Sequence, residues 1–393
     1  PQHSLGQIPP SMSLPPKSIR VLHVYKTYYP DTTGGVEMVL CQLMRALHPM
    51  GVENRLLVLS PEANPVRMEY PEAQVIRCRT SLEMASNPMS LSALGEFRRQ
   101  LDWADIVHYQ FPWPFGDLLH LLKGGRKPSV VSYQSDIVRQ KNLMCLYRPL
   151  MRRFLASVDR LCATSPNYRE TSVVLSPLRK RVDVIPNGLD SAMCPPATTE
   201  VLDQWRSRLG HGFFLFVGVL RYYKGLHTLV EASVGIDLPV VIAGSGPERD
   251  ALEAQARKQG ASRVHFLGHV SEEDKSALLQ LAGAFVFPSH LRSEAFGMSL
   301  VEASMYSKPM VSCEIGTGTS YVNLDGVTGL TVPPENPAAL RAAMLQLLND
   351  PAEARLMGLA ARQRYEEKFT GQCMAVSYLR LYRELLGHEH SFL

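Results

Sequence analysis

The alternation of apolar and amphipathic segments constrains the fold of this chain more than any other feature. Short apolar runs, which we interpret as strands, are separated by longer stretches whose apolar residues recur at helical spacing. Strands that alternate with helices form parallel sheets covered by helices on both faces. The predicted strands span residues 20–25, 55–59, 74–77, 106–109, 129–133, 161–164, 182–185, 213–219, 240–243, 264–267, 284–288, 310–313 and 330–332.

A polar, proline-containing stretch, residues 187–199, divides these strands into two groups. We therefore predict an α/β protein with two Rossmann-like domains facing each other across a cleft, residues 19–195 and 196–370. Residues 1–18 carry five prolines and lack the basic-then-apolar order of a targeting peptide, so we expect a disordered tail. Residues 371–393 contain a last amphipathic helix, about 373–386, whose apolar stripe must be buried against something.

The composition excludes several classes of protein. Hydrophobic residues make up 45% of the 393, which is ordinary for a globular protein, and no apolar run is long enough to span a membrane. The seven cysteines show no Cys-x-x-Cys spacing, which favours reduced thiols over disulfides or zinc sites. We therefore expect a cytoplasmic protein, either free or peripheral on the inner face of the plasma membrane.

The net charge of +4 is unevenly distributed along the chain. Residues 1–190 hold 23 Lys and Arg against 16 Asp and Glu, whereas residues 191–393 hold 18 against 21. A basic first half is either a plain solvated surface or a face for an anionic acceptor or an anionic membrane. No nucleic-acid-binding motif accompanies the charge, so we expect no nucleic-acid partner.

Two carboxylates, Glu294 and Glu302, occur in the segment Ser-Glu-Ala-Phe-Gly-Met-Ser-Leu-Val-Glu, residues 293–302. A strand precedes the segment and a helix follows, so Glu294 is predicted on a loop at the carboxyl end of a strand and Glu302 inside the next helix. Ligands of open α/β sheets bind at that edge, and the helix start favours anions. A glycosidase pair is disfavoured, because eight helical residues rise about 12 Å and hydrolase carboxylates lie about 5–9.5 Å apart.

Cations and glycines recur at the predicted carboxyl ends of other strands. Gly218 allows a tight turn after the strand at 213–219, and Arg221 and Lys224 follow before a helix, where they can hold a diphosphate. Gly244 lies in Ala-Gly-Ser-Gly-Pro-Glu, residues 243–248, where Arg249 replaces the third glycine of a dinucleotide fingerprint. A nicotinamide site is therefore not predicted, and no P-loop motif is present either.

Glycine loops open two further helices. Gly34 and Gly35 follow the first strand and allow close approach to an anion, although a purely structural turn remains the alternative. The segment 316–323, which includes Thr317, follows another strand and could bind a phosphate with its amides.

Together these segments resemble glycosyltransferase family 4, the retaining enzymes that use nucleotide sugars. The specific part is the Glu-x7-Glu pattern of Glu294 and Glu302, and the resemblance extends from about residue 20 to 386. The family's Gly-Arg-Leu-x-x-x-Lys-Gly motif is altered here: Val219 takes the place of the arginine, and Arg221 comes two residues later. The 316–323 loop is similar to the form found in bacterial mannosyl- and rhamnosyltransferases of surface polysaccharide synthesis.

The resemblance implies the GT-B fold, in which a C-terminal helix crosses back to the first domain. It assigns Glu302 to the ribose hydroxyls, Glu294 to the sugar hydroxyls, and Lys224 and Arg221 to the diphosphate. The remaining donor-binding residues would be Gly34, Gly35, Gly218, Gly244, Phe296, Gly297, Met298 and Thr317.

On the acceptor side the resemblance implies roles for residues that end two strands of the first domain. His108 and Asp136 are the predicted catalytic groups there, and His108 or Gln110 should point toward the cleft. Relatives commonly carry histidine where Gln110 and Gln134 stand. Glutamine can hydrogen-bond a sugar but cannot shuttle a proton.

The implied function is transfer of a hexose, with GDP-mannose or a GDP-deoxyhexose as the expected donor, to a hydroxyl of a glycan or lipid-linked glycan in bacterial O-antigen or exopolysaccharide synthesis. No metal cofactor is expected, because no Asp-x-Asp motif is present and protein cations can neutralise the diphosphate. Two alternatives stay open: a sugar-nucleotide epimerase or hydrolase of the same fold, and a non-catalytic nucleotide-sugar-binding subunit.

Overall fold

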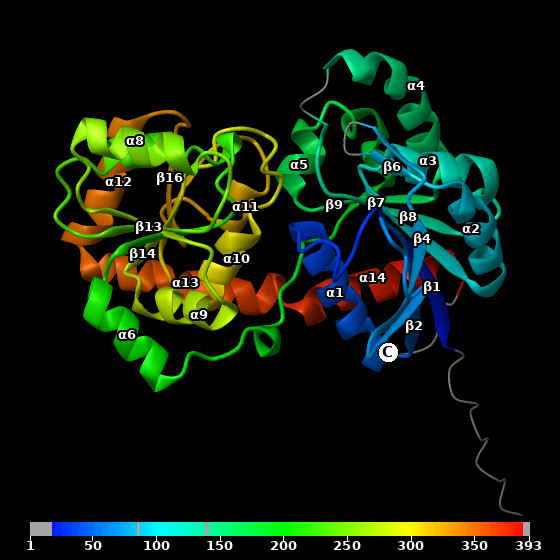
Figure 1. Ribbon diagram of the computed structural model, residues 1–393, viewed down its shortest axis with the longest axis horizontal. Coiled ribbons are helices and arrows are strands. Elements are labelled where there is room, and N and C mark those ends of the chain that lie inside the picture. Colours follow the sequence, from blue (N-terminus) through cyan, green and yellow to red (C-terminus); the bar gives the residue numbers. More distant parts are fainter. Residues whose placement is uncertain (1–17, 85–86, 138–140, 388–393) are drawn as a thin grey trace, which may run out of the picture.

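The computed structural model describes residues 18–84, 87–137 and 141–387, which form two α/β halves side by side (Figure 1). The first half contains an eight-stranded sheet in the order β10-β9-β8-β7-β1-β2-β4-β3, and the second a six-stranded sheet in the order β13-β12-β11-β14-β15-β16. The predicted class, two Rossmann-like α/β units, is confirmed. The tail predicted at 1–18 lies outside the described residues except for Ser18.

The strands of the first half are β1 Ile19–Val24, β2 Val52–Ser60, β3 Arg67–Tyr70, β4 Ala73–Arg79, β7 Ile106–Phe111, β8 Ser129–Tyr133, β9 Arg160–Ala163 and β10 Val182–Val184, with a separate antiparallel pair, β5 Leu82–Met84 and β6 Asn87–Met89. Those of the second half are β11 Phe214–Val217, β12 Val240–Ala243, β13 Val264–Gly268, β14 Ala284–Phe287, β15 Met310–Cys313 and β16 Gly329–Val332.

The helices that flank the first sheet are α1 Gly35–Leu47, α2 Leu91–Trp103, α3 Pro114–Leu119, α4 Lys141–Ser157 and α5 Pro166–Thr171, with short turns η1 His48–Met50, η2 His120–Gly124 and η3 Ser176–Arg181. The remaining ones are η4 Ser191–Met193, α6 Thr199–Leu209, η5 Tyr222–Lys224, α7 Leu226–Ala232, α8 Arg249–Gln259, α9 Glu272–Leu281, α10 Met298–Met305, α11 Thr319–Val322, α12 Pro337–Asn349, α13 Pro351–Lys368 and α14 Gly371–Leu385. No helix in these described ranges has the length and apolar character needed to cross a bilayer.

The central strands are buried on both faces, as continuous apolar runs predict. Every residue of β7 and of β14 is buried. The second sheet is wholly parallel, but the first is not, because β3 runs antiparallel to β4 at its edge. Only residues 71–72 separate β3 from β4, and so short a connection joins antiparallel strands alone. The predicted strands omitted β3, so the prediction of parallel sheets lacked this antiparallel edge.

The chain crosses between the two halves twice, and the two crossings lie side by side. The first crossing is the predicted connection after β10, and the second is the short break between α13 and α14. The Leu189 amide donates to the Phe369 carbonyl at 2.9 Å, and the Gly371 amide donates to the Leu189 carbonyl at 3.3 Å. A Cβ on Gly188 would lie 2.2 Å from the Thr370 carbonyl oxygen, so only glycine allows this approach. The predicted domain limits at 195 and 370 stay a prediction.

Helix α14 returns to the first half and completes its core (Figure 1). Its side chains Met374, Tyr378 and Tyr382 are buried against apolar residues of β1, α1, β7 and β8. This confirms the expected crossing of the C-terminal helix. The predicted apolar stripe holds except at Val376, which is 42% exposed and faces away from the sheet.

Candidate active site

The loop after β14 and the start of α10 form the centre of the candidate site. Glu294 lies in this loop and Glu302 in the second turn of α10, as predicted, and both are buried, with 9% and 6% of their surface exposed. Gly297 ends the loop in the left-handed region at φ +91°, which favours glycine. Phe296 is buried against Phe369, with ring centroids 5.9 Å apart. The segment is therefore a rigid turn that fixes both carboxylates.

The structure brings Lys224 and Glu294 together, although 70 positions separate them. The Nζ atom of Lys224 lies 2.5 Å from Oε2 of Glu294, and 4.7 Å from the centre of the Phe287 ring. A Cβ on Gly225 would lie 2.0 Å from the Pro288 carbonyl, so this glycine lets the η5 turn approach the β14 loop. The buried pair places a cation, which could bind a phosphate, beside a carboxylate, which could accept hydrogen bonds from hydroxyl groups.

Arg221 is in a different environment from Lys224. It precedes the η5 turn and is exposed to solvent. The structure therefore places one predicted cation inside the site and the other on its surface, and a role for Arg221 with the diphosphate stays a prediction.

Glu302 is paired with a cation that we did not predict. Lys275, on α9, places its Nζ atom 2.7 Å from Oε1 of Glu302 and 2.7 Å from Oε2 of Glu272. Burial lowers the pKa of Lys275, but the attraction of the two carboxylates outweighs it and raises the pKa above its ordinary value. No sequence motif marks Lys275, because it lies in a helix whose many charged residues are typical of a solvated surface.

The glycine turns at the ends of β11 and β12 contact each other. A Cβ on Gly244 would lie 1.9 Å from the Gly218 carbonyl oxygen, and the Gly218 amide donates to the Ala243 carbonyl at 3.0 Å. Gly244 is therefore needed for close packing of the turns, whereas a Cβ on Gly218 would meet the Phe216 ring at 3.2 Å. Their place at the carboxyl edge of the second sheet is the one predicted for the donor.

The loop before α1 is held by a carboxylate that the sequence analysis did not single out. Glu37 is 5% exposed and accepts hydrogen bonds from Thr27 at 3.0 Å and Thr32 at 2.6 Å. A Cβ on Gly34 would lie 2.4 Å from the Glu37 carboxylate, whereas a Cβ on Gly35 would meet nothing within 4 Å. The nearby carboxylate thus explains why position 34 is glycine, whereas Gly35 leaves the start of the helix open.

Met298 and Thr317 complete the predicted donor residues. Met298 begins α10 and packs against the apolar cores of both halves. Thr317 is fully buried, and its hydroxyl lies 3.4 Å from that of Thr319. The Thr317 side chain is thus turned into the protein.

His108 does not point toward the cleft, which corrects our expectation. Its ring is fully buried beneath α14, where Nδ1 lies 2.7 Å from the Tyr382 hydroxyl and Nε2 lies 2.7 Å from the Ser132 hydroxyl. Burial, with a smaller effect of nearby His23, lowers the pKa of His108 well below its ordinary value. A neutral ring whose two nitrogens both have polar partners in the core is structural, so direct proton transfer by His108 is not supported.

Gln110 and Gln134 are buried and paired with each other. The Gln134 amide donates to Gln110 at 2.9 Å, and the Asn187 amide donates to Gln134 at 3.1 Å. The two glutamines thus link the ends of β7 and β8 to the first crossing between the halves. Their contact with an acceptor stays a prediction.

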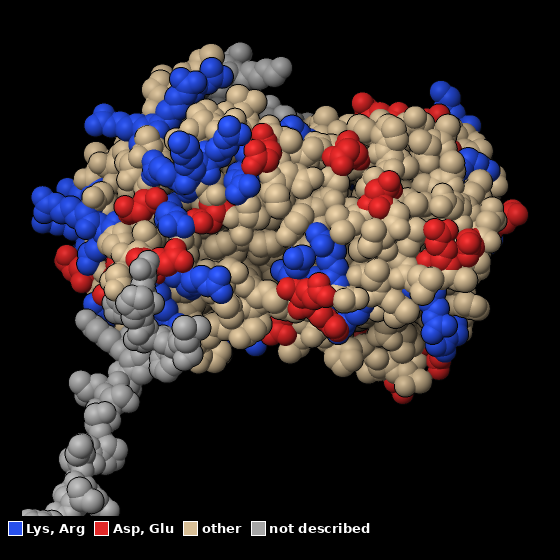
Figure 2. All heavy atoms as spheres, turned by 180° about the vertical axis from the view of Figure 1, so that it is seen from behind, with Lys and Arg blue, Asp and Glu red and all other residues tan. Residues whose placement is uncertain are grey.

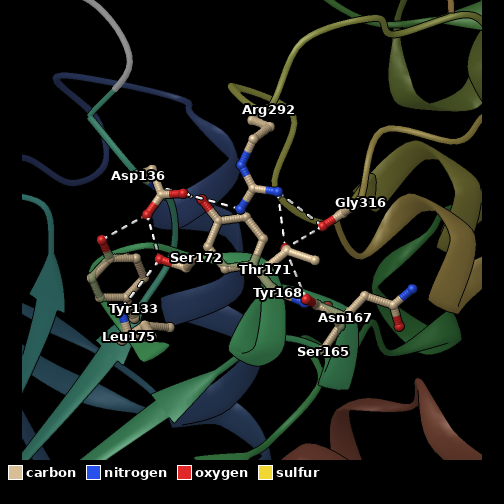
Figure 3. Close-up of polar contacts among 10 residues, drawn as sticks. All are labelled: Tyr133, Asp136, Ser165, Asn167, Tyr168, Thr171, Ser172, Leu175, Arg292 and Gly316. Atoms are coloured by element: carbon tan, nitrogen blue, oxygen red, sulfur yellow. Dashed lines mark hydrogen bonds and ion pairs between the residues drawn. The ribbon is translucent and has the colours of Figure 1, made fainter. Parts of the chain in front are cut away.

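Asp136 follows β8 and is bound from both halves of the protein (Figure 3). Its carboxylate accepts hydrogen bonds from the Tyr133 hydroxyl at 2.9 Å and the Ser172 hydroxyl at 2.7 Å. Arg292, in the β14 loop of the second half, donates to the other oxygen at 3.1 Å. Arg292 was missed in the sequence, although it stands two residues before Glu294.

Two cavities in the described structure lie away from these residues. One, of about 530 Å³, lies against the outer strand β13, and the other, of about 480 Å³, lies at the amino ends of the second sheet's strands. Because ligands of such sheets bind at the carboxyl edge, we base the site on the residues above rather than on these cavities. Across residues 18–84, 87–137 and 141–387, no three or more His, Cys, Asp or Glu side chains gather to hold a metal ion.

Comparisons with known proteins match almost the whole chain to glycosyltransferases. The family model described as Glycosyltransferase Family 4 matches residues 33–192, and the one described as Glycosyl transferases group 1 matches residues 198–364. D-rhamnosyltransferase WbpZ of Pseudomonas aeruginosa is 54% identical over 352 residues, which is 90% of this chain and 92% of the relative. O-antigen chain mannosyltransferase C of Escherichia coli is 46% identical over 368 residues, covering 94% and 99%.

Solved structures share the fold at low sequence identity. Sucrose-phosphate synthase from Thermosynechococcus elongatus superposes with a TM-score of 0.76 at 21% identity, covering 94% of this chain and 100% of that one. HepE of Anabaena in complex with UDP-glucose gives a TM-score of 0.70 at 17% identity, covering 94% and 100%.

Proposed function

The chain belongs to glycosyltransferase family 4, and from that premise we propose that it moves a hexose from a nucleotide diphosphate sugar to a hydroxyl of a glycan or lipid-linked glycan. That it is a hexosyltransferase follows from its two relatives of 54% and 46% identity, and its fold is the GT-B fold. The observation that carries the proposed chemistry is the buried Lys224–Glu294 pair beside the loop before α10, with Glu302 inside α10.

The donor would lie along the carboxyl edge of the second sheet. In this proposal Lys224 and the exposed Arg221 neutralise the diphosphate, Glu294 binds hydroxyls of the sugar, and Glu302 binds the ribose. Negative charge grows on the diphosphate as the bond to the sugar breaks, so a positioned cation stabilises the transition state more than the ground state. Before the donor binds, Lys224 and Lys275 hold the two carboxylates in place.

We infer a retaining reaction in which a leaving-group oxygen takes the proton of the acceptor hydroxyl. The support is that the candidate acceptor-side groups are ill suited as bases: His108 is buried, and Asp136 already accepts three hydrogen bonds. The anomer of the product, read by proton NMR before it equilibrates, tests retention directly. Inversion would contradict it.

GDP-mannose or a GDP-deoxyhexose is the proposed donor, and bacterial O-antigen or exopolysaccharide synthesis is the proposed setting. The support is that the relatives are named as a rhamnosyltransferase and an O-antigen mannosyltransferase. We propose that no metal is needed, which transfer in the presence of EDTA would test. Relatives named as transferases also weaken the epimerase, hydrolase and binding-subunit alternatives.

The test of the donor assignment is calorimetric binding of UDP-, GDP-, ADP- and dTDP-sugars to the purified protein. We expect one GDP-sugar to bind, with binding lost in Glu302→Ala and retained in Glu253→Ala, a carboxylate on α8 paired with Arg249. Binding of a UDP-sugar alone would overturn the choice of base. Absence of binding across the panel would contradict the nucleotide-sugar site itself.

We further propose a cytoplasmic protein that contacts the inner face of the plasma membrane through its first half. Lys and Arg gather on that half, seen on the left in Figure 2. The exposed residues of η2 and α4 combine cations with apolar side chains, a mixture that suits an anionic lipid surface. They are Leu122, Lys123, Leu146, Arg148, Arg152 and Arg153.

Sedimentation with vesicles tests this contact. We expect binding to phosphatidylglycerol vesicles, weakened by salt and by the double change Arg148→Glu with Arg152→Glu, and weak binding to phosphatidylcholine. Arg257→Glu, on α8 of the other half, is the matched control and should bind as the wild type does. Equal binding by all proteins would contradict the assignment.

A further inference from the structure

We propose that Arg292 is a positioning residue that ties the two halves of the enzyme together across the site, and that Asp136 is its anchor rather than a group that contacts the acceptor. The proposal rests on the transferase function and goes beyond it, because it assigns Arg292 a role and changes the one expected for Asp136. It concerns how the donor-side loops are held against the first half.

Arg292 makes three polar contacts with its guanidinium group, as Figure 3 shows. One nitrogen donates to the Asp136 carboxylate at 3.1 Å, and another donates to the Thr171 hydroxyl at 2.9 Å and the Gly316 carbonyl at 3.0 Å. The guanidinium carbon also lies 5.0 Å from the centre of the Tyr168 ring. Asp136, Tyr168 and Thr171 belong to the first half, whereas Arg292 and Gly316 belong to the second.

Further contacts join the same two surfaces. The Thr171 hydroxyl lies 2.6 Å from the Gly316 carbonyl oxygen, and the Asn167 amide donates to the Ser320 hydroxyl at 3.2 Å. Helix α5, which carries Asn167 and Thr171, therefore docks on the loop before α11. That loop is the one predicted to meet a phosphate of the donor.

Both carboxylate oxygens of Asp136 are engaged in this arrangement. Its carboxylate accepts three hydrogen bonds, from Tyr133, Ser172 and Arg292, and its backbone amide donates to the Tyr168 hydroxyl at 2.5 Å. A carboxylate whose oxygens already have three donors has little capacity left for the hydroxyl of an acceptor. Its geometry suits an anchor for a cation from the other half.

Arg292 can transmit this contact to the catalytic loop. The turn that contains it is closed by the Glu294 amide, which donates to the Leu291 carbonyl at 3.0 Å. A shift of Arg292 therefore shifts Glu294 and releases Gly316 at the same time. Only the planar fork of arginine reaches three partners in this way, and lysine offers a single point of charge.

Amide hydrogen exchange of the ligand-free protein tests the tie without any substrate. We expect Arg292→Ala to speed exchange at least threefold in both segments 166–172 and 314–322, and Arg292→Lys to do the same to a lesser degree. Thr171→Val, which removes one shared hydroxyl and keeps the shape, should act in the same direction. The control Arg169→Ala removes a half-exposed arginine of α5 that pairs with Glu170, and should leave segment 314–322 unchanged.

Wild-type exchange in either segment of Arg292→Ala would overturn the proposal, because loss of a contact that joins two segments must loosen both of them.

Steady-state kinetics with GDP-mannose provides a second, independent test. Arg292→Ala and Asp136→Asn should each lower kcat at least tenfold, with the KM for the acceptor within threefold of wild type, and the double variant should lose no more than either single one. Additive losses, or a raised acceptor KM in Asp136→Asn alone, would show that Asp136 contacts the acceptor. Failure of the wild type to use GDP-mannose would exclude that sugar as the donor without touching the tie, since the exchange result is independent of the donor.

Discussion

Replacing Lys224 with alanine should reduce transfer strongly while leaving the fold in place. Lys224 is the cation nearest to Glu294 in the described structure, at 2.5 Å, and both side chains are 11% exposed. A hydrogen bond to a charged group contributes about 1.5–3 kcal/mol, and each 1.36 kcal/mol corresponds to a tenfold change in rate. We therefore expect kcat/KM to fall by about 10- to 150-fold.

The loss should appear mainly in kcat, since charge on the diphosphate is larger in the transition state than in the bound donor. Lys224→Met, which keeps the apolar stem against Phe287, should lose as much activity as Lys224→Ala. A double variant with Glu294→Gln should lose less than the two single losses combined, because the pair acts as a unit.

Initial rates of transfer with the donor found by calorimetry provide the measurement, and thermal unfolding checks that each variant is folded. Lys258→Ala, an exposed lysine of α8, serves as the control and should stay within twofold of wild type. If the Lys224 variants retained kcat/KM within threefold of wild type, the assignment of Lys224 to the leaving group would be refuted.

Three further predictions concern stability. Gly188→Ala should cost about 1–3 kcal/mol in urea denaturation, because its Cβ would overlap a carbonyl of the second crossing, whereas Gly95→Ala, in open space on α2, should not destabilise. Tyr382→Phe should cost about 1–3 kcal/mol by leaving a buried nitrogen of His108 unpaired. Burial lowers the pKa of His23 and of His120 to about 4, below the unfolded value near 6.5. The stability that each neutral histidine contributes is present above pH 6.5 and is lost as the pH falls toward 4. At pH 5.5 the free energy of unfolding should be lower by about 1.4 kcal/mol for each histidine. His120→Gln should therefore flatten the slope of unfolding free energy with pH.

Much of the fold could be predicted because apolar runs that are buried on both faces have a strong pattern. The strands β8, β12 and β15 match their predicted limits. Strand β3 was missed because an edge strand with alternating exposure has too few apolar residues to stand out. The order of strands within each sheet is set by contacts between distant segments, which the local pattern does not contain.

The residues of the candidate site were likewise predicted only in part. Glu294 and Glu302 could be placed on their loop and helix because the strand, the glycine and the apolar helix surround them in the sequence. Lys275 and Arg292 could not, since their importance comes from partners 27 and 156 positions away. His108 was placed wrongly because alternation along β7 cannot show that a helix from the end of the chain covers that face.

Helix α14 has a consequence for biosynthesis. The ribosome makes it after both sheets, yet it supplies the side chains that close the core under the first sheet. While α13 is still being translated, the second half already has its strands, but the earlier half has only α1 on the face that α1 and α14 share, and the part that α14 covers is exposed. The half that is made first therefore completes its core only after α14 has been made, and apolar surface exposed in such an intermediate is prone to aggregate.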